Sequence, residues 1–179
     1  MNARTFLGSI IATAALALGL AAPLSVQAAQ PTPANNIVDV AIAVNSSGPY
    51  AGQFDTLIAA VQAADPAVVK RLTSKRQSTV FAPTDDAFAK LGLTPASVST
   101  LPREFLTDVL LYHVLNGRRG SADILASTRL RTLLGGILRQ AGGVLTDNLG
   151  RQAAIIVTDV PASNGVIHAI DTVVLPYAP

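Results

Sequence analysis

The 179-residue sequence contains no cysteine and no tryptophan, and aromatic residues make up only 4% of it. Without cysteine there is no disulfide, no lipid attached through a lipoprotein-type thiol, no thiolate metal site and no cysteine nucleophile. The stability of the fold must therefore come from packing. Exported domains without disulfides are more typical of bacteria than of animals, which predicts a bacterial periplasm or culture medium as the setting.

Groups that carry catalysis are also scarce. The chain has two histidines, His113 and His168, and a single glutamate, Glu104. It has neither the G-x-S-x-G turn that presents a serine nucleophile nor the H-E-x-x-H pair of zinc proteases. Scattered aspartates that meet in space as an acid–base pair, as in glycosidases, are left open. The prediction is a protein that is not an enzyme and has no metal or cofactor.

Charge is sparse and nearly balanced. There are 13 basic and 11 acidic side chains, and loss of Arg4 with an N-terminal leader would leave 12 basic against 11 acidic. So small a surplus argues against general nucleic-acid binding. After the N-terminal run no segment reaches the roughly 20 apolar residues that a membrane span needs. The prediction is a chain with no membrane span once its leader is removed.

Residues 1–28 have the layout of a secretory signal peptide, because Arg4 precedes an apolar run over residues 6–22. Cleavage is expected after Ala28 or Ala29. An uncleaved anchor is the alternative, but the run is short for a bilayer and contains glycine, serine and threonine. The prediction is a secreted or periplasmic protein, with a polar spacer over residues 29–35, one domain over 36–176 and a tail over 177–179.

The first half of that domain has the pattern of helices and the second half that of strands. Apolar spacing and capping residues predict helices near residues 37–44, 54–62, 66–72, 85–91 and 102–112, with a strand at 79–81. Between Leu130 and Leu175, short runs rich in Val, Ile and Leu alternate with glycine pairs, which predicts strands and hairpin turns. Helices followed by strands predict an α+β fold, with helices packed on an antiparallel sheet.

Three segments, in this order, resemble the fasciclin (FAS1) family. Residues 79–88 (TVFAPTDDAF) are similar to its first conserved block, residues 110–115 (LLYHVL) to its Tyr-His motif, and residues 164–171 (NGVIHAID) to its closing block. The resemblance extends over about residues 36–176. It implies a compact wedge in which a twisted, sandwich-like β assembly carries several helices, used in adhesion and extracellular-matrix proteins and not as a catalyst.

Residues of the first and closing blocks also have plain folding roles. A strand meets a proline that cannot continue the ladder, a threonine caps the next helix, and an Asn-Gly pair supplies a turn. The adjacent Asp85 and Asp86 point about 100° apart on a helix, which argues against a cation site there. The residues predicted to be structural are Thr79, Phe81, Pro83, Thr84, Asp85, Phe88, Asn164, Gly165, His168 and Asp171.

Tyr112 and His113 match the family motif that is implicated in binding cell-surface receptors. By that resemblance they are candidate contact residues, and contact would require them to be exposed. The alternative is that His113 extends the apolar face of its helix and is buried with internal hydrogen bonds.

A run of arginines is the other candidate site. Arg129 and Arg131 share one face of a regular strand, and guanidinium groups suit sulfate, phosphate and carboxylate partners. The alternative is a solvated sheet edge. The full set of possible anion contacts is Arg118, Arg119, Arg129, Arg131 and Arg139, opposed over this stretch only by Asp123.

The function that these features predict is an exported adhesion or interaction module that binds a cell-surface protein or a polysaccharide. The alternative is a carrier of an apolar small molecule, because the helices are rich in aliphatic residues. A carrier would need an unfilled apolar cleft of about 300 Å³ or more. The sequence specifies neither the ligand nor the oligomeric state.

Overall fold

The structure is a computed structural model and describes residues 35–178. The predicted signal peptide and nearly all of the predicted spacer lie outside these residues. The described helices are α1 (Ile37–Ser46), α2 (Asp55–Ala63), α3 (Pro66–Thr73), α4 (Asp85–Ala89), α5 (Pro95–Val98), α6 (Arg103–Tyr112) and α7 (Ser121–Ala126). The described strands are β1 (Ser78–Pro83), β2 (Val114–Asn116), β3 (Arg129–Arg131), β4 (Ile137–Ala141), β5 (Val144–Thr146), β6 (Gln152–Ala162) and β7 (Gly165–Ile170).

The strands form one sheet in the order β2-β1-β7-β6-β5-β4-β3. The two outer strands of this order also meet, because Leu115 of β2 bridges Thr132 just after β3 and the Leu133 N–H donates to the Val114 carbonyl at 2.7 Å. The sheet therefore closes on itself. Closure removes the exposed strand edges through which open sheets aggregate.

The predicted α+β class is confirmed, but one strand pair departs from the expected antiparallel sheet. β1 and β7 run parallel, whereas the other neighbouring strands are antiparallel. Parallel neighbours need a long crossover connection. Here that connection includes α4 to α7 and five strands, so no local pattern in either strand could reveal the pairing.

Helices begin where the capping residues predicted. The Asn36 side chain accepts hydrogen bonds from the backbone of Val38 and Asp39 at the start of α1. Asp65 caps α3 with Pro66 in its first turn, and Thr84 caps α4. These side chains satisfy N–H groups that have no partner inside the helix.

A first cluster of buried side chains, the inner core, lies inside the closed sheet, among the inward side chains of its strands. Every member is at most 1% exposed. Because side chains alternate along a strand, Leu130, Leu138 and Leu145 point into this cluster while their neighbours face outward. The inner core consists of Phe81, Tyr112, Leu115, Ile124, Leu130, Leu138, Leu145, Ala153, Ile170 and Val174.

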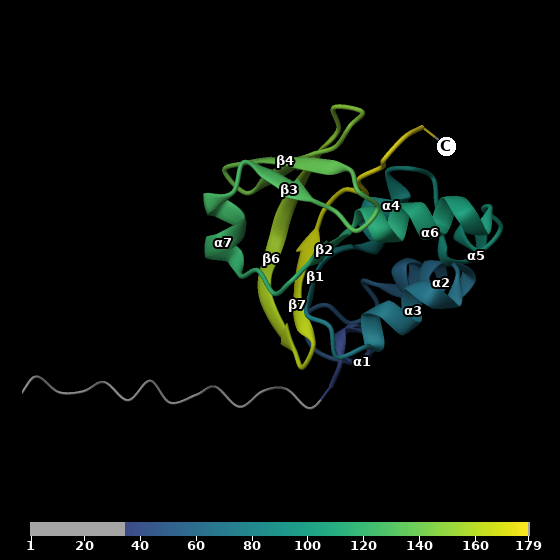
Figure 1. Ribbon diagram of the computed structural model, residues 1–179. Coiled ribbons are helices and arrows are strands. Elements are labelled where there is room, and N and C mark those ends of the chain that lie inside the picture. The colour runs from purple at the N-terminus through teal and green to yellow at the C-terminus, as the bar shows by residue number, and fades with distance from the viewer. Residues whose placement is uncertain (1–34, 179) are drawn as a thin grey trace, which may run out of the picture. The chain divides into compact units, whose positions relative to one another are not determined.

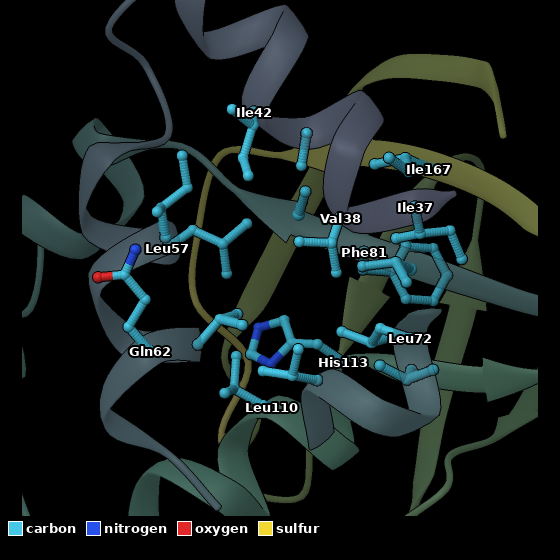
Figure 2. Close-up of a pocket in the computed structure, with 17 residues that line it drawn as sticks. Ile37, Val38, Ile42, Leu57, Gln62, Leu72, Phe81, Leu110, His113 and Ile167 are labelled. Carbon is cyan, nitrogen blue, oxygen red and sulfur yellow. The ribbon is translucent and has the colours of Figure 1, made fainter. Parts of the chain in front are cut away.

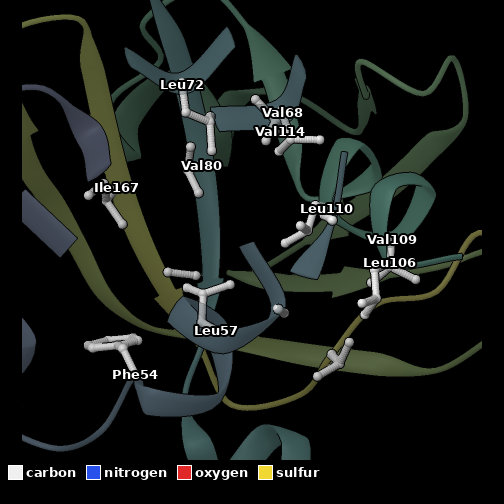
Figure 3. Close-up of a cluster of buried hydrophobic side chains, with 14 of the residues drawn as sticks. Phe54, Leu57, Val68, Leu72, Val80, Leu106, Val109, Leu110, Val114 and Ile167 are labelled. Atoms are coloured by element: carbon white, nitrogen blue, oxygen red, sulfur yellow. The ribbon is translucent and has the colours of Figure 1, made fainter. Parts of the chain in front are cut away.

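A second cluster, the outer core, lies between the sheet and helices α1 to α6. Figure 1 shows these helices on one side of β1 and β7 and α7 on the other. Figure 3 shows Leu57 and Leu110 on helices and Val80 and Ile167 on strands, all members of this cluster. The outer core consists of Ile37, Phe54, Leu57, Ala60, Ala64, Val68, Leu72, Val80, Ala82, Ala87, Phe88, Val98, Leu106, Val109, Leu110, Val114, Ala162, Ile167, Ala169, Val173 and Leu175.

Candidate functional site

Three of the five candidate arginines share one outward surface of the sheet. Arg129 of β3 stands directly opposite Arg139 of β4, and Arg131 lies two residues along β3 on the same face. All three are exposed, whereas Leu130 and Leu138, which alternate with them, are buried in the inner core. We refer to Arg129, Arg131 and Arg139 as the arginine face.

The arginine face has no acidic partner within the described residues. The salt bridges there join Lys90 to Asp171 and Arg151 to Asp147, and neither includes a member of the face. Like charges directly opposite one another on neighbouring strands destabilise the pairing. Folding therefore does not explain why Arg129 and Arg139 face each other.

Arg118 and Arg119 lie elsewhere, on the segment between β2 and α7. The Arg118 guanidinium donates to the carbonyl of Ala162, at the end of β6 opposite to the end that pairs with β5. The Arg119 backbone N–H donates to the Thr79 hydroxyl at 2.8 Å, and its carbonyl accepts from His168. The predicted run of five arginines is thus two separate groups.

A polar hollow of about 280 Å³, the cup, adjoins the arginine face. Arg139 belongs to both, and Thr146 of β5 stands directly opposite Arg139 in the ladder. The cup is lined by Ile137, Arg139, Thr146, Asp147, Asn148 and Gly150.

The turn between β5 and β6, which makes one wall of the cup, is fixed by Asp147. One carboxylate oxygen accepts from the backbone N–H groups of Leu149 and Arg151, each at 2.9 Å. The other accepts from the Arg151 guanidinium and from the Leu175 N–H, also at 2.9 Å. The Asp147 side chain is fully buried, and its negative charge is balanced inside the fold by Arg151 and by backbone N–H groups. The spacing of Asp147 and Arg151 in the sequence was an available signal for this salt bridge.

Tyr112 lies beneath the cup and joins two of its walls. Its side chain is 0% exposed, and its hydroxyl donates to the Ile137 carbonyl at 3.2 Å. Burial raises the pKa of Tyr112, and a backbone hydrogen bond from Asn148 counters part of that rise. The ring fits against Gly136, where an added Cβ would lie 2.6 Å from the ring. Tyr112 therefore offers no surface for the receptor contact that the family resemblance implied.

His113 is likewise internal. It is 3% exposed, its Nδ1 donates to the Val109 carbonyl at 2.6 Å, and its Nε2 accepts from the Val174 N–H at 3.3 Å. Burial lowers its pKa to about 4, more than the hydrogen bond to Val109 raises it. The histidine is thus neutral at pH 7 and holds α6 against the segment after β7, in agreement with the buried alternative.

Residues of the closing block connect distant parts of the chain. The buried Asn164 accepts from the Ile37 N–H and donates to the carbonyls of Leu72 and Ser74, so one side chain ties α1, α3 and the β6–β7 hairpin together. A Cβ on Gly165 would overlap the Ser78 carbonyl, which explains why glycine stands beside β1. The turn that these two residues were predicted to make is therefore also a junction.

His168 points to the apolar ring of Phe81, with ring centroids 5.8 Å apart, but it also has polar partners. Its Nδ1 accepts from the N–H of Asp159, a residue with φ 61°, and its Nε2 donates to Arg119. These bonds hold an irregular stretch of β6.

Asp171, predicted to be structural, bonds to the backbone and accepts from the Ala154 N–H at 2.8 Å. Burial alone would raise the pKa of Asp171, but this hydrogen bond, the bonds from Lys90 and Thr172, and the charge of Lys90 hold it below its ordinary value.

The first block is mainly internal. Phe81, Pro83 and Phe88 are buried, and the Thr79 hydroxyl donates to the Gly117 carbonyl at 2.8 Å. Asp85 accepts from the Thr56 N–H and so caps α2. In residues 35–178 no cluster of three or more His, Asp or Glu is placed to hold a metal ion.

An apolar cleft opens on the helical side, between α1, α2 and the sheet (Figure 2). Ile42 and Leu57 stand along it, Gln62 is at one end, and His113 lies among apolar side chains. The cleft measures about 150 Å³, and a second apolar hollow beside α5 and α6 measures about 230 Å³. Both are smaller than the roughly 300 Å³ expected for a carrier site.

A sheet closed on itself, with helices against one face, is the architecture of the FAS1 fold. The solved FAS1 domain pair of the insect cell adhesion molecule Fasciclin I superposes with a TM-score of 0.60 at 20% identity, covering 80% of this chain and 51% of that one. At that identity the likeness shows the fold, and this chain spans about half of the pair.

The chain belongs to the fasciclin family, whose Fasciclin domain model matches residues 52–176. Protein sll1483 of Synechocystis sp. is 42% identical over 127 residues, covering 69% of this chain and 67% of that protein. Protein sll1735 of the same organism is 36% identical over 142 residues, covering 78% and 97%. The family is generally a non-enzymatic module, common in adhesion and extracellular proteins.

Proposed function

We propose that the protein is an exported interaction module that binds an anionic cell-surface or matrix partner through the arginine face. The observation that carries this proposal is the directly opposed pair of Arg129 and Arg139, with Arg131 beside it and no salt bridge from an acid of residues 35–178 to any of them. An anionic partner would relieve the repulsion between these charges, and guanidinium forks suit carboxylate and sulfate groups.

Export is part of the proposal and depends on the predicted signal peptide. Within residues 35–178 no helix is long and apolar enough to cross a membrane. Mass spectrometry of the secreted or periplasmic protein should find an N-terminus at Ala29 or Gln30. A chain that keeps residues 1–28 and sediments with membranes would contradict export in processed form.

The test of the binding proposal compares two double variants that each remove two positive charges. Arg129→Ala/Arg131→Ala changes the arginine face, and Lys70→Ala/Arg103→Ala changes exposed positions on α3 and α6. Binding of the purified protein to immobilised polygalacturonate is measured at low and high salt. We expect salt-sensitive binding that the first variant weakens at least tenfold and the second leaves nearly unchanged, since exposed charges act over short distances in salt.

Equal effects of the two double variants would show that only net charge matters. No change with either would overturn the arginine face as a binding surface. The melting temperatures of both variants serve as the folding control, because surface substitutions away from packed positions change stability little.

A second candidate function is the carriage of a very small apolar molecule, for which the cleft between α1 and α2 still has room although it is too small for a drug-sized ligand. The cleft's volume of about 150 Å³ is comparable to an apolar cavity that binds benzene. Solvent extraction of the purified protein followed by mass spectrometry tests it: a stoichiometric apolar compound that is lost in Ala41→Trp would support the carrier, and an empty extract would count against it.

A further inference from the structure

We propose that the cup seats one sugar ring of an acidic polysaccharide while the arginine face, which lies next to the cup on β3 and β4, holds the acid groups of that ring and of its neighbours on that side. This inference rests on the proposed function and deepens it by choosing among anionic partners. An acidic protein segment and an anionic lipid surface carry the same sign of charge. In a polysaccharide, unlike in these two, each acid group is surrounded by the hydroxyl groups of sugar rings.

The chemistry of the cup favours a hydroxylated ligand. Beside the Arg139 guanidinium it presents the Thr146 hydroxyl and the Asn148 side chain, an uncharged mixture of donors and acceptors. Asp147 forms part of the wall, yet its carboxylate is fully buried and bonded to backbone and to Arg151. The Asp147 carboxylate therefore accepts no hydrogen bond from a ligand. Because its charge is paired with Arg151, it also repels an acidic ligand only weakly.

The dimensions favour a single ring connected to others. At about 280 Å³ the cup falls just under the range of about 300–1,000 Å³ in which drug-sized ligands are enclosed. Arg131 lies about 7 Å from Arg129 along β3, by the strand repeat. The cross-strand Arg139 is about 5 Å from Arg129 and reaches into the cup. This arrangement suits a chain that carries one acid group after another.

The cup is held in shape before any ligand arrives. Asp147 fixes one wall, and the Tyr112 hydroxyl bonds to the Ile137 carbonyl of the other. A site whose walls are fixed loses less conformational freedom on binding. Tyr112 and Asp147 are therefore positioning residues, which gives the tyrosine of the Tyr-His motif a role that needs no exposure.

The experiment separates ring recognition from charge recognition. Binding of the purified protein is measured to polygalacturonate, to polyglutamate of matched charge, and to phosphatidylglycerol vesicles. Thr146→Trp fills the cup at a half-exposed strand position that tolerates an aromatic residue. Thr158→Trp makes the same change at an exposed position of β6, and Asn148→Ala provides a milder change in the cup.

We expect the protein to bind polygalacturonate at least tenfold more tightly than polyglutamate. Thr146→Trp should remove that preference while leaving polyglutamate binding unchanged, Asn148→Ala should reduce it in part, and Thr158→Trp should do neither. Equal affinity for the two polymers, tighter binding to vesicles, or a preference that survives both cup variants would overturn the cup while leaving the arginine face standing. If Arg129→Ala/Arg131→Ala binds both polymers as tightly as the unchanged protein does, the proposed function itself is overturned.

Discussion

The two cores of this domain differ in how completely they are filled. Members of the inner core are at most 1% exposed, whereas members of the outer core reach 8%. Three apolar hollows, of about 150, 30 and 230 Å³, open on the helical side. Of the inner-core residues only Phe81 lines any of them.

This difference shows how one sheet can serve two purposes. A closed sheet over a fully packed interior keeps its outward residues at fixed spacing, which suits recognition of a repeating anionic ligand. The helical layer is less tightly filled and is better suited to adapt. The arginine face and much of the cup lie on strands β3, β4 and β5, whose inward residues Leu130, Leu138 and Leu145 belong to the inner core.

The largest expected effect comes from removing a leucine from each core. Leu138→Ala should lower the free energy of unfolding by about 3–5 kcal/mol, because the packed surroundings cannot collapse into the cavity. Leu57→Ala, beside the existing cleft, should lower it by about 2–3 kcal/mol. Urea unfolding measures both. Equal losses would mean that the two cores are equally well packed.

The next effect concerns pH and the histidine that borders the outer core. The folded pKa of His113 is about 4, below the unfolded value of about 6.5. As pH falls the unfolded state is therefore protonated first. The stability that His113 contributes is fully present above about pH 6.5 and is lost as pH falls toward 4, by about 3 kcal/mol.

Denaturant unfolding at several pH values checks this, with His113→Gln as the comparison. The variant should be less stable at pH 7 but should lose less stability between pH 6.5 and 4. The depressed pKa values of Asp159 and Asp171 act below this window, because their unfolded values are near 3.9. An unchanged slope in His113→Gln would assign the pH dependence elsewhere.

Enlarging one alanine on each side of the sheet tests the same difference in packing, with a smaller expected change in stability than the leucine substitutions. Ala153→Leu in the inner core should destabilise the fold by about 1–3 kcal/mol, because no space exists for the extra carbons. Ala41→Leu, which points into the apolar cleft, should change stability by less than about 1 kcal/mol. Thermal unfolding of the two variants measures the difference. A larger drop in melting temperature for Ala41→Leu than for Ala153→Leu would contradict the conclusion that the helical side is the less tightly packed one.

Tyr112→Phe should have the smallest effect on stability, about 1 kcal/mol, because it removes one hydroxyl and leaves the ring in place. Its effect on recognition should be clearer. The preference for polygalacturonate over polyglutamate should fall, while binding to polyglutamate stays constant. A preference that persists would show that the hydroxyl does not position the cup.

Local features of the fold were predictable because their causes are local. Asn36, Asp65 and Thr84 cap helices within two or three residues of themselves. Strand alternation correctly placed Arg129 and Arg131 on one face. The two glycine pairs mark the turns on either side of β4, as the predicted hairpin required.

Features that depend on distant partners were not predictable from the sequence alone. Arg139 joins the arginine face only through the register of β3 and β4. Asp147 was recognisable as a turn residue, but its bond to the Leu175 N–H spans 28 positions, and that of Asn164 to the Ile37 N–H spans 127. The parallel pairing of β1 and β7 has the same origin.

Chemical-shift mapping of the ¹⁵N-labelled protein titrated with oligogalacturonate tests the account most directly, because it compares both sides of the molecule at once. We predict that shifts concentrate at residues 129–131, 137–141 and 144–150 and leave α1 and α2 unchanged. Shifts confined to α1 and α2 around the apolar cleft would contradict recognition by the sheet and would place the binding site in the helical layer.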